Sequence, residues 1–350
     1  MIFCRVQRKN LSKDKYLSID GSFGEGGGQI LRTALSLSMI TGTPIHLYNI
    51  RAGRKKSGLL RQHLVCVQAS QMISHAEVTG ASLGSTEIYF RPQAVTAGTF
   101  ELNIGSAGST FLVLQTLLPA LLLQNSLSTI RIQGGTHNPM APTAEFIQQC
   151  FVPALAKMGV NMTVRLEQAG FAPIGGGKIH VEIQPWTQRL SYQVLQTGEL
   201  LALNAFANCL NLDSNIAVRE LITLKHKLQL NHTSQYQLDG ISQGNCLYVQ
   251  AEFEHHSQIF TALGEHKKPS ESIANKLAKT VKQYLASDAV ADEYLTDQLL
   301  LPMALGQGGR FTAQMISEHS RTQADMIMRF LDVKIAFEKK DKHDLVRVTV

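Results

Sequence analysis

The chain has 350 residues, of which 44% are hydrophobic and 17% are charged. This ordinary globular composition suits a large core and two domains. No apolar stretch is long enough to span a membrane, and the polar first residues lack the apolar region of a secretory signal, so we expect a cytoplasmic protein without membrane contact. The five cysteines are scattered, odd in number and never spaced C-x-x-C, which predicts reduced thiols without a zinc knuckle or disulfide frame.

The formal net charge of +6 is mild, but its placement is uneven. No aspartate or glutamate occurs between Glu25 and Glu77. The same stretch holds six positive side chains, namely Arg32, Arg51, Arg54, Lys55, Lys56 and Arg61. Such a surface favours a polyanion, because lysine and arginine neutralise phosphates and release counterions. A solvated basic loop is the alternative interpretation.

In chain order, the pattern predicts a strand at 16–20, a glycine-rich loop, an apolar helix at 29–41, a strand at 44–50 and a helix at 59–74. Strands at 86–92 and 99–105 precede a second small-residue loop, "GSAGST", and another apolar helix at 111–123. Further strand patterns occupy 128–134, 160–168 and 178–185.

A weak internal repeat appears in three apolar helical segments, "LLPALL" around Pro119, "FVPALA" around Pro153 and "LLPMAL" around Pro302. Repeated strand–loop–helix units would produce this signature. The amino-acid composition is more polar from about 187 to 286, and this stretch contains no apolar helical segment built around a proline. We interpret that stretch as an inserted domain, with the helical pattern from Pro269 returning to the core.

The glycine loop "GSFGEGGGQILR" resembles a nucleotide-binding loop without matching either common motif. Gln29 stands where the last glycine of G-x-G-x-x-G belongs, and the later "GGGK" is followed by Ile179 instead of serine or threonine. Glycines can nevertheless turn the backbone tightly and bring Glu25, Gln29 and Arg32 into one cleft. A tight turn with an exposed glutamate is the alternative.

The segment "RAGRKKSGLLRQH" carries clearer chemistry. Arg51 and Arg54 lie in a short glycine-containing turn after a strand, and an arginine fork suits phosphate oxygens. Arg61, Gln62 and His63 begin the next helix, whose N-terminus attracts anions. A basic turn without a ligand remains the alternative.

The twelve histidines include no paired metal motif, and the ligase signature K-x-D-G is absent. Spacing alone therefore selects no catalytic histidine. His319, in "MISEHSRTQADM", reads on its own as a helix cap or polar surface residue.

Seven segments taken together resemble the RNA 3′-terminal phosphate cyclase family: "GEGGGQILR", "RAGR", "GLLRQH", "IGSAGST", "GGTHNPMAPTAEF", "GGG" and "EYLTDQLLLPMAL". They occur in order and with fitting spacing over the chain after about Tyr16. The resemblance implies an α+β (α/β) fold, in which repeated units of two helices pack on a four-stranded sheet and a smaller α/β domain is inserted. The change in composition noted above places this insert at 187–286 and the core at 1–186 and 287–350.

The resemblance also implies a set of site residues. His319 occupies the place of the family's nucleophile, after "YLTDQ" and a strand. The matching catalytic residues are Glu25, Arg32, Arg51 and Arg54, with Glu25 also facing a metal. The residues that match the RNA or phosphate contacts are Arg51, Arg54, Arg61 and Gln62. The residues that match nucleotide contacts are Gln115, Pro142, Phe146, Tyr294, Leu295, Thr296, Asp297 and Gln298. About eleven extra residues before the first motif and the polar setting of His319 depart from the family pattern.

The implied activity uses ATP and Mg²⁺ or Mn²⁺ to convert an RNA 3′-terminal phosphate into a 2′,3′-cyclic phosphate. A covalent histidine–AMP and an RNA(3′)pp(5′)A end are the implied intermediates, and no obligatory protein partner is evident. Two alternatives stay open. One is the family's non-catalytic branch in ribosome assembly, which lacks the histidine. The other is an enolpyruvyl transferase, which also stacks repeated units around a basic cleft.

Overall fold

The computed structural model describes residues 15–24 and 26–350, which form four mixed sheets of four strands each. Three of the sheets belong to βαβαββ units that repeat one strand order. The first unit comprises β1 (Leu17–Asp20), α1 (Gln29–Thr41), β2 (Ile45–Tyr48), α2 (Arg61–Ser74), β3 (Glu77–Thr79) and β4 (Ile88–Arg91). The predicted α+β class with repeated helix-on-sheet units is confirmed.

The second unit repeats this order, with a composite second helix. Its elements are β5 (Thr99–Asn103), α3 (Thr110–Leu122), β6 (Ser128–Gly134), α4 (Ala144–Phe146), the π-helix η1 (Ile147–Phe151), α5 (Val152–Ala156), β7 (Met162–Gln168) and β8 (Gly177–Ile183). Pro153 lies at the start of α5 and has no backbone N–H to donate to the preceding turn, which accounts for an irregular helix at this point.

The third unit is split by the insert. It comprises β9 (Tyr192–Val194), α8 (Glu293–Leu305), β14 (Gly309–Ala313), α9 (Glu318–Phe330), β15 (Lys334–Lys339) and β16 (Asp344–Thr349). The short strand β9 pairs in parallel with β14, in register Gly309↔Tyr192. It therefore belongs to a core sheet, although its polar setting falls within the range 187–286 that the sequence suggests for the insert.

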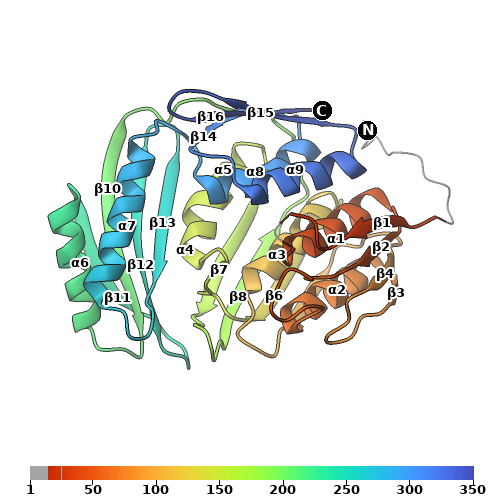
Figure 1. Ribbon diagram of the computed structural model, residues 1–350, viewed down its shortest axis with the longest axis horizontal. Coiled ribbons are helices and arrows are strands. Elements are labelled where there is room, and N and C mark those ends of the chain that lie inside the picture. The colour runs from red at the N-terminus through yellow and green to blue at the C-terminus, as the bar shows by residue number, and fades with distance from the viewer. Residues whose placement is uncertain (1–14, 25) are drawn as a thin grey trace.

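The insert forms the fourth sheet, in the order β11-β10-β12-β13. Its elements are β10 (Leu200–Leu210), α6 (Asn215–Lys227), β11 (His232–Gln237), β12 (Gly244–Phe253), β13 (Ser257–Leu263) and α7 (Ser270–Leu285). One face of the sheet packs with α6 and α7 around Leu224 and Val281, and the other face joins the main core through Cys246, Tyr248 and Ile259. Figure 1 shows the insert at the end of the molecule opposite the first unit.

The helices of the three units pack against one another, with α1 contacting α2, α3 and α9, and α8 contacting α9. The main hydrophobic core runs through all three units. Pro119 and Pro302 occupy the same place in the first helices of the second and third units, whereas Pro153 belongs to a second helix. Two of the three prolines in the predicted repeat therefore lie at equivalent positions of two units, and the third does not.

No helix in the described part of the chain is both long and apolar enough to cross a bilayer.

The four described cysteines, Cys66, Cys150, Cys209 and Cys246, are buried free thiols. Cys4 lies outside the described residues.

Candidate active site

Two glycine loops surround the start of α2. The loop before α1 lies against the 51–54 turn, because a β-carbon on Gly26 would come 3.1 Å from the backbone nitrogen of Gly53. Gly26 has φ of 56°, a left-handed conformation that glycine adopts without strain. The loop before α3 lies against Gln62, whose Oε1 accepts a hydrogen bond from the backbone of Ser109 at 2.7 Å. Both loops therefore converge on one helix N-terminus.

Arginine side chains fill the space that the glycines leave open. A β-carbon on Gly27 would come 3.0 Å from Nη2 of Arg54, and one on Gly105 would come 3.3 Å from Nη1 of Arg61. The missing side chains thus make room for guanidinium groups close to the backbone. Such a cradle suits a phosphate group, because backbone N–H groups and fixed positive charges then face the same space.

Arg32 and His63 meet beside Gly28. A β-carbon there would touch Nε2 of His63 and would come 2.8 Å from Nη1 of Arg32. Burial and the charges of Arg32 and Arg51 lower the pKa of His63 to about 3, so its imidazole is neutral near pH 7. Its Nδ1 accepts a hydrogen bond from the backbone of Leu60 at 3.3 Å, which places the remaining proton on Nε2. His63 therefore presents an N–H group toward the cleft.

His319 is the second residue of α9 and is half-buried against α1. Its Nδ1 lies 2.7 Å from Oε1 of Gln29. The Gln29 amide nitrogen donates to Oδ1 of Asp297 at 2.9 Å and to the backbone carbonyl of His319 at 3.1 Å. These two acceptors fix the orientation of the amide, so Oε1 faces the imidazole. Since a carbonyl oxygen only accepts, the neutral imidazole of His319 carries its proton on Nδ1 and its lone pair on Nε2.

A second polar pair joins the same two helices one turn further on. Thr33 donates to Oε1 of Gln323 at 2.6 Å. Gln29 and Thr33 are four residues apart on α1, as His319 and Gln323 are on α9, so each pair presents one helix face to the other. The two helices are thereby held in a fixed register at the candidate nucleophile.

The segment 294–298 on α8 divides into buried and exposed members. Tyr294 is 63% exposed, so its ring is available to a ligand, whereas Leu295 and Thr296 are fully buried. Gln298 accepts a hydrogen bond from Gln115 on α3 at 2.5 Å. Asp297 carries the contact to Gln29 described above. The structure thus brings Asp297 and Gln298 to the cleft, while Leu295 and Thr296 support the helix.

Burial lowers the pKa of the Arg32 guanidinium, and the neighbouring charge of Asp297 opposes this effect. Arg51 has a left-handed φ of 56° and donates to the carbonyls of Lys56 and Gly58 at 2.6 and 3.1 Å. Its side chain therefore holds the turn that carries Arg54.

Pro142 and Phe146 lie in the second unit, on either side of Thr143, which caps α4 through a hydrogen bond to the backbone of Phe146. They belong to a different unit from His319, which lies on α9 of the third. Glu25, and with it the predicted metal contact, lies outside the described residues.

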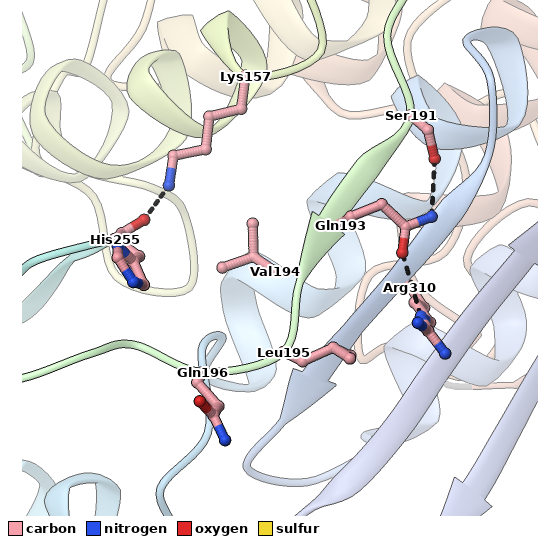
Figure 2. Close-up of a pocket in the computed structure, with 8 residues that line it drawn as sticks. All are labelled: Lys157, Ser191, Gln193, Val194, Leu195, Gln196, His255 and Arg310. Carbon is pink, nitrogen blue, oxygen red and sulfur yellow. Dashed lines mark hydrogen bonds between the residues drawn. The ribbon is translucent and has the colours of Figure 1, made fainter.

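A cavity of about 680 Å³ between the core and the insert is separate from this cleft. Figure 2 shows Lys157 reaching the backbone carbonyl of His255 on one side, and Arg310 bonded to Gln193 on the other. Among the described residues, none predicted for catalysis or nucleotide binding lines this cavity.

Sequence reasoning placed Gln29 in the cleft without its contact to His319, and it noted His63 only as part of a helix start. The signal in the sequence is the spacing of polar residues. Gln29 and Thr33 are four residues apart and so lie on one face of their helix. His319 and Gln323 do the same on theirs. That spacing becomes informative only when the two helices are known to be neighbours.

The architecture and the site define a repeated α+β protein with a cluster of arginines at two glycine loops, near a half-buried histidine. The family model described as RNA 3′-terminal phosphate cyclase matches residues 23–337. The chain is 47% identical over 335 residues to an RNA 3′-terminal phosphate cyclase of Koribacter versatilis, covering 95% of this chain and 94% of that protein. Proteins of the same name from Ralstonia nicotianae and Salmonella enteritidis are 43% and 41% identical, covering 95% and 96% of this chain and 97% and 99% of those proteins.

The chain therefore belongs to the RNA 3′-terminal phosphate cyclase family. This finding agrees with the resemblance derived from the sequence motifs and does not favour an enolpyruvyl transferase.

Proposed function

We propose that this protein is an enzyme that uses ATP to convert an RNA 3′-terminal phosphate into a 2′,3′-cyclic phosphate, with His319 as the covalent carrier of AMP. Membership of the cyclase family supports the overall reaction. The observation that carries the mechanism is the hydrogen bond between His319 Nδ1 and Gln29 Oε1 at 2.7 Å. In the neutral imidazole this bond selects the tautomer whose Nε2 carries the lone pair and can act as the nucleophile.

In the first step, the lone pair of His319 Nε2 attacks the α-phosphorus of ATP. A phosphorus–nitrogen bond forms, the α–β phosphoanhydride bond breaks, and pyrophosphate leaves with its electron pair. The imidazole then carries positive charge, which Asp297 offsets through the Gln29 amide. Gln29 also prevents rotation of the ring between attack and release.

The cleft offers positive groups for the phosphates. Arg32 and Arg54 lie beside glycines without side chains, and His63 adds a neutral N–H donor. Fixed donors of this kind stabilise charge that develops on phosphoryl oxygens. A bound Mg²⁺ or Mn²⁺ would supply further charge neutralisation on the triphosphate. Its proposed contact, Glu25, lies outside the described residues.

The adenine is proposed to lie between the exposed ring of Tyr294 and the segment of Pro142 and Phe146, with Gln115 and Gln298 nearby. Aromatic faces suit a purine through stacking. Gln115 donates to Gln298 at 2.5 Å, and both side chains are only partly buried, so either amide can turn to a ligand while the other is solvated.

In the second step, an oxygen of the RNA 3′-phosphate attacks the phosphorus of the AMP, and the bond to Nε2 breaks. In the third step, the neighbouring ribose 2′-hydroxyl attacks the RNA phosphate, loses its proton and expels AMP. We propose that Arg54 and Arg61, which lie beside Gly27 and Gly105, hold the RNA phosphate during both displacements. Such recognition depends on phosphate and 2′-hydroxyl groups more than on base sequence.

The test is incubation of the protein with ATP labelled at the α-phosphate and magnesium, without RNA, followed by a denaturing gel. We expect a labelled protein band that is stable to alkali and labile to acid, as a phosphoramidate is. Added RNA with a 3′-phosphate should discharge the label and become resistant to phosphatase. A protein that never acquires label would contradict the proposal and favour the non-catalytic branch of the family.

A further inference from the structure

A buried carboxylate lies where the insert meets the second unit. Glu145 is only 4% exposed and belongs to the short helix α4, between Pro142 and Phe146. Burial of a charge is costly unless donors surround it. The partners of Glu145 therefore show what this position requires.

Two donors come from the core and two from the insert. His137 Nε2 lies 3.1 and 3.2 Å from the two carboxylate oxygens of Glu145, and its ring stacks on Phe171 with centroids 4.5 Å apart. The backbone of Glu145 itself also contributes. Asn208 of the insert donates to Oε1 at 2.7 Å, and the Cys246 thiol lies 3.8 Å from Oε2.

The insert supplies its two donors from one place. Asn208 on β10 and Cys246 on β12 are directly opposite each other in the antiparallel ladder, so their side chains leave the same face of the sheet. Cys246 is part of the main core, whereas its neighbour in sequence on the other face, Asn245, contacts Glu220 within the insert. The face that carries Asn208 is thus the face applied to the core.

His137, Glu145 and Cys246 are close enough to ligate a metal ion, but their chemistry favours a hydrogen-bonded carboxylate. Burial and Glu145 raise the pKa of the Cys246 thiol, which keeps its proton. Burial would raise the pKa of Glu145, yet the charge and hydrogen bonds of His137, with the bond from Asn208, lower it to about 2. The donors therefore satisfy an ionised carboxylate without a cation.

We propose that Asn208 is a positioning residue through which the insert fixes segment 142–146, the segment proposed to contact adenine. This inference rests on the proposed function for its link to ATP. The path is short, because Asn208 holds Glu145 and Glu145 precedes Phe146 in the same helical turn. The insert thus contributes to nucleotide binding without touching the reacting atoms.

The first test replaces Asn208 with leucine in the full chain, which keeps the side-chain size and removes the donor. The matched control is Asn204→Leu, because Asn204 lies on the same strand and face but contacts Glu252 instead. Without nucleotide, hydrogen exchange of peptides covering 142–151 should be about tenfold faster in Asn208→Leu and unchanged in Asn204→Leu, as expected for loss of one bond to a charged group. Unchanged exchange in both variants would overturn the inference.

The second measurement is the ATP dependence of self-labelling. Asn208→Leu should raise the KM for ATP about tenfold and leave the rate at saturating ATP within about threefold of wild type. Faster exchange together with an unchanged KM would refute the link to the nucleotide site. Failure of the proposed function itself is recognised separately, since wild-type protein would then acquire no label.

A third variant, Asn208→Asp, keeps the inference testable if the leucine variant does not fold. The introduced carboxyl group cannot donate when it is ionised and then repels Glu145, but it can donate when it is protonated. The ratio of the variant's KM to that of wild type should therefore fall as the pH is lowered from about 8.5 to 6. A KM equal to that of wild type at every pH in this range would overturn the inference. The inference would also be overturned if stoichiometric zinc copurified with wild type and with Cys209→Ala but not with Cys246→Ala, because Glu145 would then bind a metal ion.

Discussion

At the scale of single residues, the important feature is the way a neutral amide selects a histidine tautomer. Gln29 has one acceptor and two donor hydrogens, and Asp297 and the His319 carbonyl occupy the donors. The remaining oxygen can only accept, so the proton on His319 is confined to Nδ1. A carboxylate in the place of Gln29 would also bind Nδ1, but it would favour the imidazolium form, which lacks the lone pair that the proposed attack needs.

The substitution His319→Ala should abolish labelling by ATP and block cyclisation of an RNA 3′-phosphate, because the phosphorus then has no nitrogen to accept it. An RNA end supplied already adenylylated bypasses this step and should still be cyclised at an appreciable rate, since only the 2′-hydroxyl must be positioned. A gel of labelled protein and a phosphatase-resistance assay on the RNA measure both effects. Labelling that survives in the variant would refute His319 as the carrier.

The substitution Arg54→Ala should lower turnover by about 100-fold, the usual effect of losing one preorganised charged donor. Lys55→Ala is the matched control, because it removes the same charge from an exposed position in the same turn and should have little effect. Initial rates of RNA cyclisation measure both. Near wild-type turnover in Arg54→Ala would remove the turn from the reaction.

The sequence indicated several of these residues but not their relations. The resemblance located His319, which spacing alone could not distinguish from eleven other histidines. The contact between Gln29 and His319 joins residues 290 positions apart, so no local pattern contains it. The altered pKa of His63 was equally hidden, because it depends on burial and on two arginines from different elements.

At the scale of elements, glycines are placed where side chains from other elements need space. Gly28 is the N-cap residue of α1 with φ of −82°, an ordinary conformation for any residue. The neighbouring His63 and Arg32 require the space that its missing side chain leaves, and not its backbone freedom. The glycines of the loop before α1 therefore serve to make room for neighbouring side chains as well as to turn the backbone.

The substitution Gly28→Ala should consequently impair self-labelling by at least about tenfold, because a methyl group displaces the His63 ring or the Arg32 guanidinium. Gly98→Ala offers a control, since a β-carbon there meets only the Phe100 ring at 3.5 Å, an ordinary contact. Labelling rates at saturating ATP compare the two variants. Equal activity of both would mean that the cleft tolerates the displacement.

Element prediction from the sequence succeeded where apolar periodicity was strong, as in α1 and α3. It was least informative for β9, a strand of three residues in a polar stretch that pairs with β14 more than a hundred positions later. The composite helix 144–156 was seen only as an apolar proline segment, because a π-helical turn depends on packing that propensities do not encode.

At the scale of the whole molecule, a buried carboxyl group in the insert links stability to pH. Glu220 is 1% exposed and accepts hydrogen bonds from Asn245 at 2.8 and 2.9 Å. Burial raises its pKa to about 7 from an ordinary value of 4.5. The folded state therefore holds a proton between these pH values that the unfolded state releases.

Stability from this group is complete below pH 4.5 and is lost as the pH rises to 7, by about 3 kcal/mol at most. Glu220→Gln should remove this dependence, so the variant should match wild type near pH 4.5 and be more stable at pH 8. Urea unfolding at both pH values measures the difference. The exposed Glu199→Gln in the same domain should behave as wild type, and a variant that is no more stable at pH 8 would contradict the assignment.

The interruption of the third unit by the insert has a consequence for how the chain acquires its activity during synthesis. The first two units consist of continuous stretches and can fold as they emerge, whereas β9 must wait for β14. Contacts between partners so distant in sequence form late, because a long loop must first close. Gln29 likewise waits for His319, so a nascent or truncated chain that ends before α9 contains the arginines of the first unit but not the proposed nucleophile. The order of synthesis thus adds the proposed nucleophile only after the first two units, with their proposed phosphate contacts, have been made.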